Sequence, residues 1–338
     1  MLARLKLCST EGVQMDPRKI WMACAAGALT IVAPLALSQT YPNKPVRVIV
    51  GFATGGTVDI VARIVAAKLS EIWATSVLVD NRPGAGSSIS ADIAAKASPD
   101  GYTLLICGIG THAVIPAIYR KLPYDPVRDF APISQIGTTP NVLIVHPSAQ
   151  AKSVSEFIAY AKANPGKISI ASSGVGGSPH LSLELFKSMT GIDVVHVPYK
   201  GGAPALADLL GGQVPALFSN LPISLKLIKA GRVRALGITS AKRHPHLPDV
   251  LTIAESGVPG YEVTSWQGMC APAAVPKPLL AKLNTDLVKV LNMPDTQQRL
   301  AEQGVDAAPT TPEQFASHIR SEIIKWAKVV KEAGITAE

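Results

Sequence analysis

Charged side chains are scarce in this sequence. Only 17% of its residues are Asp, Glu, Lys or Arg and 5% are aromatic, whereas 47% are hydrophobic. The formal net charge is +8, yet the basic residues are scattered, without a Lys/Arg run and with few aromatic side chains between them. This pattern excludes nucleic acid as the expected partner and suits small anionic ligands.

Cysteine is almost absent. Cys8 and Cys24 belong to the N-terminal segment, Cys107 lies in the strand-like run TLLIC, and Cys270 lies in WQGMCAP. Two cysteines do not make a disulfide-rich scaffold. Free cysteines commonly pack in apolar runs of this kind, so two buried thiols are predicted rather than a bridge.

The signatures of several enzyme classes are missing. The chain has seven histidines but no HExxH, and His244-Pro245-His246 has no acidic residue in helical register, so no metal is expected. A GxSxG turn is also absent. An exported serine hydrolase using Ser178, His180 and a distant Asp remains an alternative function. His180 is expected instead to cap a helix or to contact a ligand.

The glycine turns that resemble nucleotide sites are incomplete. Residues 51–57, GFATGGT, space like a phosphate loop but lack its lysine. Gly84-Ala85-Gly86 lacks the third small residue of a dinucleotide fingerprint. No nucleotide or other cofactor is therefore expected.

Only one long apolar run is present. It follows Arg18-Lys19, reads IWMACAAGALTIVAPLAL, and is followed by Ser38. A basic flank, an apolar stretch and small residues predict a secretory signal peptide over residues 1–38, cleaved near Ser38. A membrane anchor is the alternative. We expect a periplasmic protein after cleavage.

Short β-rich runs alternate with helical patterns after this segment. Strands are predicted at 46–52, 76–80, 103–107, 141–145, 168–171, 194–197, 216–219 and 234–239. Apolar residues between them recur at helical spacing, as at Leu181 and Leu185. Such alternation predicts an α/β fold with parallel sheets covered by helices on both faces.

The C-terminal part has helical patterns only. One apolar face is formed by Leu280, Leu283 and Leu287, and a longer one by Phe315, Ile319, Ile323, Trp326 and Val330, with nothing strand-like between them. The roughly 300 residues after the signal exceed a usual single core. Crossings at 137–140 and 264–265 predict domain 1 at 39–140 plus 266–338 and domain 2 at 141–265, with a cleft between them.

Three glycine-rich strand-to-helix turns carry the functional signal. They are Thr54 to Thr57, Ser172 to His180, and Pro198 to Pro204. A helix N-terminus presents unpaired N–H groups and a partial positive charge, and glycine allows a ligand close to the backbone. The three turns together predict an anion site without a fixed cation, gripped from both domains.

Asp59 is unexpected beside an anion site. If Thr57 caps the helix, Asp59 lies in its first turn, where it complements the helix dipole and reaches Arg63 one turn later. The alternative is that Asp59 faces the cleft and binds a ligand ammonium. We favour the first interpretation, because a carboxylate facing another carboxylate is unfavourable.

The chain also resembles a known receptor family through nine motifs in order, which span residues 41–336. They are GGTVDIVAR, DNRPGAGSSI, PDGYTLL, LPYDPVRDFAPI, SSGVGGSPHLSLELF, VPYKGGAPALADLLGGQV, IKAGRVRALGITSAKR, PDVLTIAESGVPGYE and KWAKVVKEAGI. They are similar to those of the Bug receptors, the extracytoplasmic solute receptors of the tripartite tricarboxylate transporter type. Three positions depart from the family pattern: Pro is usual near Ala53-Thr54, Asn where Ile115 stands, and Pro in place of Leu251.

The resemblance implies a two-lobed periplasmic binding protein fold of type II, in which two crossing strands join the sheets, and a monomeric receptor without catalysis. It implies a small carboxylate ligand, such as a di- or tricarboxylate, an acidic amino acid or an aromatic acid. Transporter membrane subunits or a sensor protein are the implied partners.

The first two turns would hold the ligand carboxylate through N–H groups, hydroxyls and waters. The candidate ligand-binding residues are Phe52, Thr54, Gly55, Gly56, Thr57, Thr111, Ser172, Ser173, Gly174, Gly176, Gly177, Ser178, His180, Tyr199, Gly201, Gly202, Ser219, Asn220 and Gln267.

Overall fold

The computed structural model describes residues 41–119, 121–332 and 334. The predicted signal peptide lies outside the described residues. The chain divides into an N-terminal unit, Met1–Tyr41, and a compact unit, Pro42–Glu338, which contains both lobes of the fold. None of the described helices combines the length and the apolar character that a bilayer crossing demands.

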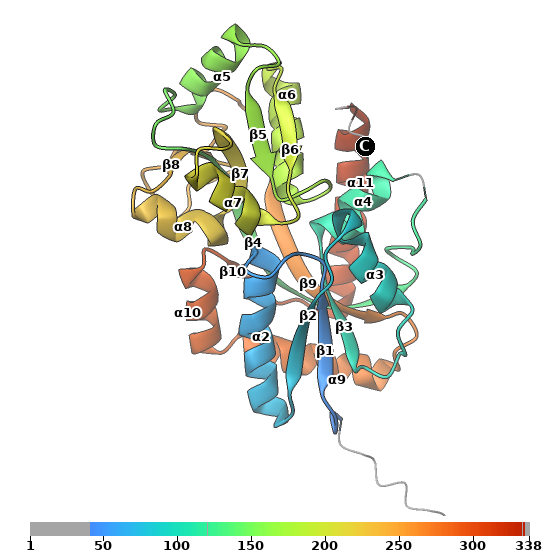
Figure 1. The fold of residues 1–338 in the computed structure, drawn as a ribbon. Coiled ribbons are helices and arrows are strands. Elements are labelled where there is room, and N and C mark those ends of the chain that lie inside the picture. The colour runs from blue at the N-terminus through green and yellow to red at the C-terminus, as the bar shows by residue number, and fades with distance from the viewer. Residues whose placement is uncertain (1–40, 120, 333, 335–338) are drawn as a thin grey trace, which may run out of the picture. The chain divides into compact units, whose positions relative to one another are not determined.

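The first lobe is built on a sheet with strand order β2-β1-β3-β9-β4 (Figure 1). The strands β1 (Val46–Val50), β2 (Val77–Asn81) and β3 (Thr103–Gly108) are parallel. Next to them, β9 (Thr264–Pro272) runs antiparallel to both β3 and β4 (Phe130–Val145). The side chains of β1 are almost all buried, as expected for a strand inside a covered parallel sheet.

The second lobe continues from the far half of β4. Residues 130–140 of β4 pair with β9, whereas residues 141–145 pair with β7 (Ala216–Asn220) and residues 142–145 with β8 (Arg234–Ile238). Beyond β7 lie the parallel strands β5 (Ser169–Ser172) and β6 (Val195–Pro198). The two-lobed fold is therefore present, while the domain boundaries at 140/141 and 265/266 stay a prediction.

Helices flank both sheets. The first lobe carries α2 (Thr57–Trp73), the short 3₁₀-helix η1 (Ala85–Ser87), α3 (Ser88–Ala95), the π-helix η2 (Gly110–Val114), α4 (Ile115–Ile118), α9 (Lys277–Leu291), α10 (Pro294–Glu302) and α11 (Pro312–Glu332). The second carries α5 (Val154–Ala163), α6 (Ser178–Thr190), α7 (Gly202–Leu210) and α8 (Leu221–Lys229).

The C-terminal helices bury the predicted faces. In α11, Phe315, Ile319, Trp326 and Val330 are buried, and the helix packs on β4, η2 and α4. The expectation that nothing strand-like separates the two apolar faces is wrong. A two-residue strand, β10 (Asp306–Ala307), pairs with β4 at Thr138 and Gly137. So short a strand leaves no periodic pattern in the sequence.

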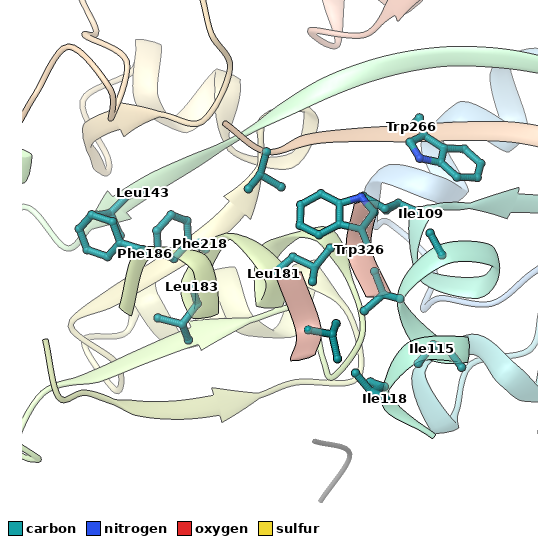
Figure 2. Close-up of a cluster of buried hydrophobic side chains, with 14 of the residues drawn as sticks. Ile109, Ile115, Ile118, Leu143, Leu181, Leu183, Phe186, Phe218, Trp266 and Trp326 are labelled. Atoms are coloured by element: carbon teal, nitrogen blue, oxygen red, sulfur yellow. The ribbon is translucent and has the colours of Figure 1, made fainter. Parts of the chain in front are cut away.

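One buried apolar cluster contains side chains of both lobes. Figure 2 shows Phe186, Phe218 and Leu143 of the second lobe at one end, and Trp266 and Ile109 of the first lobe at the other. Trp266 and Ile109 also line the cavity at which the glycine turns meet, so the lobes share apolar packing beside it.

The prediction of two free thiols is wrong. Cys107 on β3 and Cys270 on β9 form a disulfide, with Cα atoms 6.0 Å apart. Antiparallel pairing places Leu105 opposite Cys270 and Cys107 opposite Gly268, so the two cysteines are cross-strand neighbours. Their proximity depends on pairing across 163 residues of sequence, which no local pattern reveals. The bridge ties a strand that ends at the cavity to the strand beside it.

Candidate functional site

The first glycine turn connects β1 to α2. Gly56 is the N-cap residue in an extended conformation, and no side chain caps the helix. Thr57 is therefore the first helical residue rather than the cap, and its Oγ1 is buried without a hydrogen-bond partner. An uncapped helix start leaves its first N–H groups available to a ligand.

Three hydrogen bonds and an ion pair with Arg63 hold Asp59 beside this turn. Its Oδ2 accepts from the Gly55 N–H (2.9 Å) and from Arg63 Nε (3.0 Å). Its Oδ1 accepts from Asn81 Nδ2 (3.0 Å) and lies 2.9 Å from an Arg63 guanidinium nitrogen. Burial by itself would raise the pKa of Asp59, but the bonds from Arg63, Gly55 and Asn81 hold it below its ordinary value. The predicted pairing with Arg63 is confirmed.

The second turn connects β5 to α6. Gly176 has φ +81°, a conformation that favours glycine, and its N–H donates to His180 Nδ1 (3.2 Å). The His180 ring stacks on His196 with centroids 4.4 Å apart, and His196 Nε2 lies 2.7 Å from Ser172 Oγ. Burial lowers the pKa of both histidines to about 4, so both rings are neutral at pH 7. His180 thus holds the turn through the Gly176 N–H, and Ser172 is linked to His180 through the stacked ring of His196.

Two more helices begin at the same place. Gly201, with φ +136°, is the N-cap residue of α7, and Asn220 is the N-cap residue of α8. The Tyr199 hydroxyl donates to Asp208 (2.6 Å).

These helix starts converge on one cavity. Gly56 and Thr57 of α2, Gly177 and Ser178 of α6, Gly202 of α7 and Asn220 of α8 all line it. Its volume, counted as the space open to the centre of a water-sized molecule, is about 40 Å³. None of the described side chains that line it is Asp, Glu, Lys, Arg or His. Four positive helix ends without a charged side chain make an electropositive but uncharged cavity.

A network of amides and hydroxyls fixes the wall in the second lobe. Ser178 Oγ donates to Asn141 Oδ1 (3.2 Å) and accepts from Asn220 Nδ2 (3.0 Å). Asn141 Oδ1 also accepts from Asn220 Nδ2 (2.6 Å), and Asn141 Nδ2 donates to Ser182 Oγ (2.8 Å). The Ser178 hydroxyl proton is thus directed to an amide oxygen, and His180 Nδ1 is occupied by the Gly176 N–H. This arrangement does not prepare Ser178 as a nucleophile.

The turn after β3 forms the wall in the first lobe. Thr111 Oγ1 accepts from the Gly108 N–H (3.1 Å) and lies 2.9 Å from His112 Nδ1. The Thr111 hydroxyl therefore shapes the turn, although the residue lines the cavity. Complete burial lowers the pKa of His112 to about 3.

Ten of the nineteen predicted site residues line the cavity, and nine do not. Those that line it are Phe52, Gly56, Thr57, Thr111, Ser173, Gly177, Ser178, Gly202, Asn220 and Gln267. Those outside the lining are Thr54, Gly55, Ser172, Gly174, Gly176, His180, Tyr199, Gly201 and Ser219. Gly174 and Tyr199 instead line a neighbouring hollow with Lys200.

Several lining residues were not predicted from the sequence. They are Gly51, Val58, Ile106, Cys107, Gly108, Ile109, Gly110, Pro179, Ser265 and Trp266. Gly108-Ile109-Gly110 could have been found, because glycines at the carboxyl end of a strand are the signal that identified the other turns. The positions on β9 carry no such signal.

Two clusters of potential metal ligands occur among the described residues. The ligand atoms of His180, Glu184 and His196 lie within 4.8 Å of one another, as do those of Cys107, His112 and Cys270. In the second cluster both sulfur atoms belong to the disulfide. In the first, His180 Nδ1 accepts an N–H, whereas a metal on Nε2 would require Nδ1 to carry a proton. Neither donor set therefore suits a metal as it stands.

Comparisons with known proteins agree with this geometry. The family described as "Tripartite tricarboxylate transporter family receptor" matches residues 61–335. The chain is 38% identical to the protein BugT of Bordetella pertussis over 305 residues, which cover 90% of this chain and 93% of BugT.

Two solved structures from Rhodopseudomonas palustris hold carboxylates in this fold. Rpa4515 with adipate is 42% identical, with a TM-score of 0.85 over 88% of this chain and 99% of its own. MatC with bound malate is 33% identical, with a TM-score of 0.82 over 86% of this chain and 100% of its own.

Proposed function

Because the chain belongs to the family of tripartite tricarboxylate transporter receptors, whose solved relatives are periplasmic solute-binding proteins, we propose that it binds a small carboxylate without an ammonium group. The observation that carries this proposal is the convergence of four helix N-termini on a cavity without charged side chains. The ligand would be delivered to transporter membrane subunits or to a sensor protein.

Magnitudes support binding without a fixed cation. A hydrogen bond to a charged group contributes roughly 1.5–3 kcal/mol. A micromolar complex needs about 8 kcal/mol net. Roughly four such bonds from N–H groups and hydroxyls would suffice, and four helix starts on two lobes provide the donors.

The same lining argues against an amino acid. An ammonium group in the cavity would need a carboxylate partner, because an unpaired buried charge is strongly unfavourable. Asp59 is the acidic residue of the first glycine turn, but it does not line the cavity, and both of its carboxylate oxygens already accept hydrogen bonds from Arg63, Asn81 or the Gly55 N–H. The receptor should therefore distinguish an acid from its amino analogue.

Calorimetric titration with matched pairs tests the proposal. Succinate with aspartate, and adipate with 2-aminoadipate, differ only by the amino group. We expect at least one acid of these pairs to bind and its amino analogue to bind at least tenfold more weakly. Binding of a neutral sugar in preference to every carboxylate would overturn the proposal. Preferential binding of the amino analogues would overturn the statement that the ligand carries no ammonium group.

A further inference from the structure

We propose that Gln267 recognises a hydroxyl group on the ligand, so that this receptor prefers hydroxy-substituted carboxylates to the unsubstituted acids. The inference rests on the proposed function and specifies its ligand further. It comes from one buried side chain of the cavity wall whose amide oxygen has no hydrogen-bond partner within the protein.

Gln267 occupies a central position in the sheet of the first lobe. It lies on β9 opposite Gly108 of β3 and opposite Gly137 of β4. The positions directly opposite Gln267 on both neighbouring strands therefore carry no side chain. The side chain is only 3% exposed, and the residue lines the cavity.

Only one end of the amide has a partner. Gln267 Nε2 donates to Ser265 Oγ (2.9 Å), whereas Oε1 is buried without a hydrogen bond. Buried polar atoms are nearly always paired in folded proteins, so an unpaired carbonyl oxygen in a ligand cavity indicates a missing donor. An amide oxygen can only accept, and the missing partner must therefore donate.

Three other polar side chains of the wall already have hydrogen-bond partners within the protein. Ser178 and Asn220 bond to Asn141, and Thr111 bonds within its own turn. Thr57 Oγ1 is unpaired as well, but a hydroxyl at the start of α2 can donate to a carboxylate held there. The first lobe thus offers a donor for an anion at Thr57 and an acceptor at Gln267.

The donor that Gln267 requires is a hydroxyl. An ammonium group would also donate, but the lining contains no carboxylate to balance its charge. A ligand hydroxyl fulfils the requirement without adding charge. A site that hydrogen-bonds a ligand hydroxyl discriminates strongly against the analogue that lacks it, because that analogue leaves the buried acceptor unpaired.

The test compares hydroxylated and plain acids on the wild-type protein and on Gln267→Met. The pairs are malate with succinate, 2-hydroxyglutarate with glutarate, and 4-hydroxybenzoate with benzoate. We expect at least one hydroxylated member to bind at least tenfold more tightly than its plain partner. In Gln267→Met this preference should fall below threefold, while the plain acid binds about as before.

A matched control lies on the neighbouring strand. Gln135 of β4 is also buried but does not line the cavity, so Gln135→Met should keep the hydroxyl preference. Gln267→Glu keeps an acceptor at the same place. It should weaken binding of all acids through its charge but preserve the ratio within each pair, and it provides a second variant if Gln267→Met does not fold.

The outcomes separate the inference from the function on which it rests. Equal binding within every pair, or a preference unchanged in Gln267→Met, would overturn the role of Gln267 and leave the carboxylate receptor intact. Loss of the preference in Gln267→Glu would show that the amide donates to the ligand, which also contradicts the inference. If neither an acid of this panel nor adipate binds, the proposed function itself fails.

Discussion

At the scale of single residues, Asp59 shows how a negative charge can stand beside an anion site without weakening it. Two like charges about 6 Å apart cost roughly 3 kcal/mol at an effective dielectric near 20. Hydrogen bonds hold the Asp59 carboxylate against Arg63 and Asn81, and its bond from the Gly55 N–H fixes the glycine turn. Its role is therefore to hold the turn in shape.

Asp59→Asn tests this role. The substitution removes the charge that Arg63 and the Gly55 N–H share, so we expect the free energy of unfolding to fall by about 1–2 kcal/mol. Urea unfolding measures this change. Succinate affinity should stay within about threefold of the wild type. A selective loss of aspartate binding would instead assign Asp59 to a ligand ammonium.

At the scale of elements, the sequence predicts where the glycine turns lie, but it does not predict which of their residues line the cavity. The second turn was located correctly on the sequence, yet the Gly176 N–H serves His180 rather than the cavity. Of the third turn only Gly202 lines the cavity. A pattern of glycines shows where a helix starts, whereas the direction of each N–H depends on dihedral angles that tertiary contacts set.

The long strand β4 was predicted only at 141–145, although it begins at Phe130. Pro132 and Pro140 interrupt the pattern, because proline lacks the N–H that a central strand donates. The structure accommodates this stretch with irregular register between Pro132 and Ser134 and between Gln135 and Gly137. Such irregularities are determined by the partner strand, β9, which lies far away in the sequence.

Gly177 provides a test of the second turn. Its φ of −77° suits any residue, and an added Cβ would lie 3.1 Å from Ser173 Oγ, within the same turn. The larger side chain of Gly177→Val should enter the cavity at the start of α6 and weaken carboxylate binding at least tenfold. Gly211→Ala, at the end of α7, is the control and should bind normally. If the folded Gly177→Val protein binds the carboxylate with unchanged affinity, the anion is bound elsewhere.

At the scale of the whole compact unit, glycines let the two lobes approach each other closely. An added Cβ on Gly110 of the first lobe would lie 3.1 Å from the Gly176 carbonyl oxygen of the second, and one on Gly86 would lie 2.9 Å from the Val175 carbonyl oxygen. Ile115 also reaches the position that a Cβ on Gly176 would occupy. Backbone atoms and the Ile115 side chain therefore bring the lobes into close contact at these glycines.

Gly110→Ala tests whether this contact belongs to the ligand-bound state. Overpacking of this kind costs about 1–3 kcal/mol, so we expect roughly tenfold weaker binding and a smaller ligand-induced contraction in small-angle scattering. The thermal stability without ligand should change little. Full contraction together with wild-type affinity would mean that the contact is irrelevant to binding.

The paths of β4 and β9 also have a consequence for the order of folding. The sheet of the second lobe is complete once residues 141–238 have been synthesised. The sheet of the first lobe needs β9, which ends at Pro272, and α11 packs on it later still. Chain segments that lie far apart in sequence pair slowly, because a long loop must close first. The second lobe can therefore fold during synthesis, whereas the first lobe can fold only after its C-terminal segments have been made.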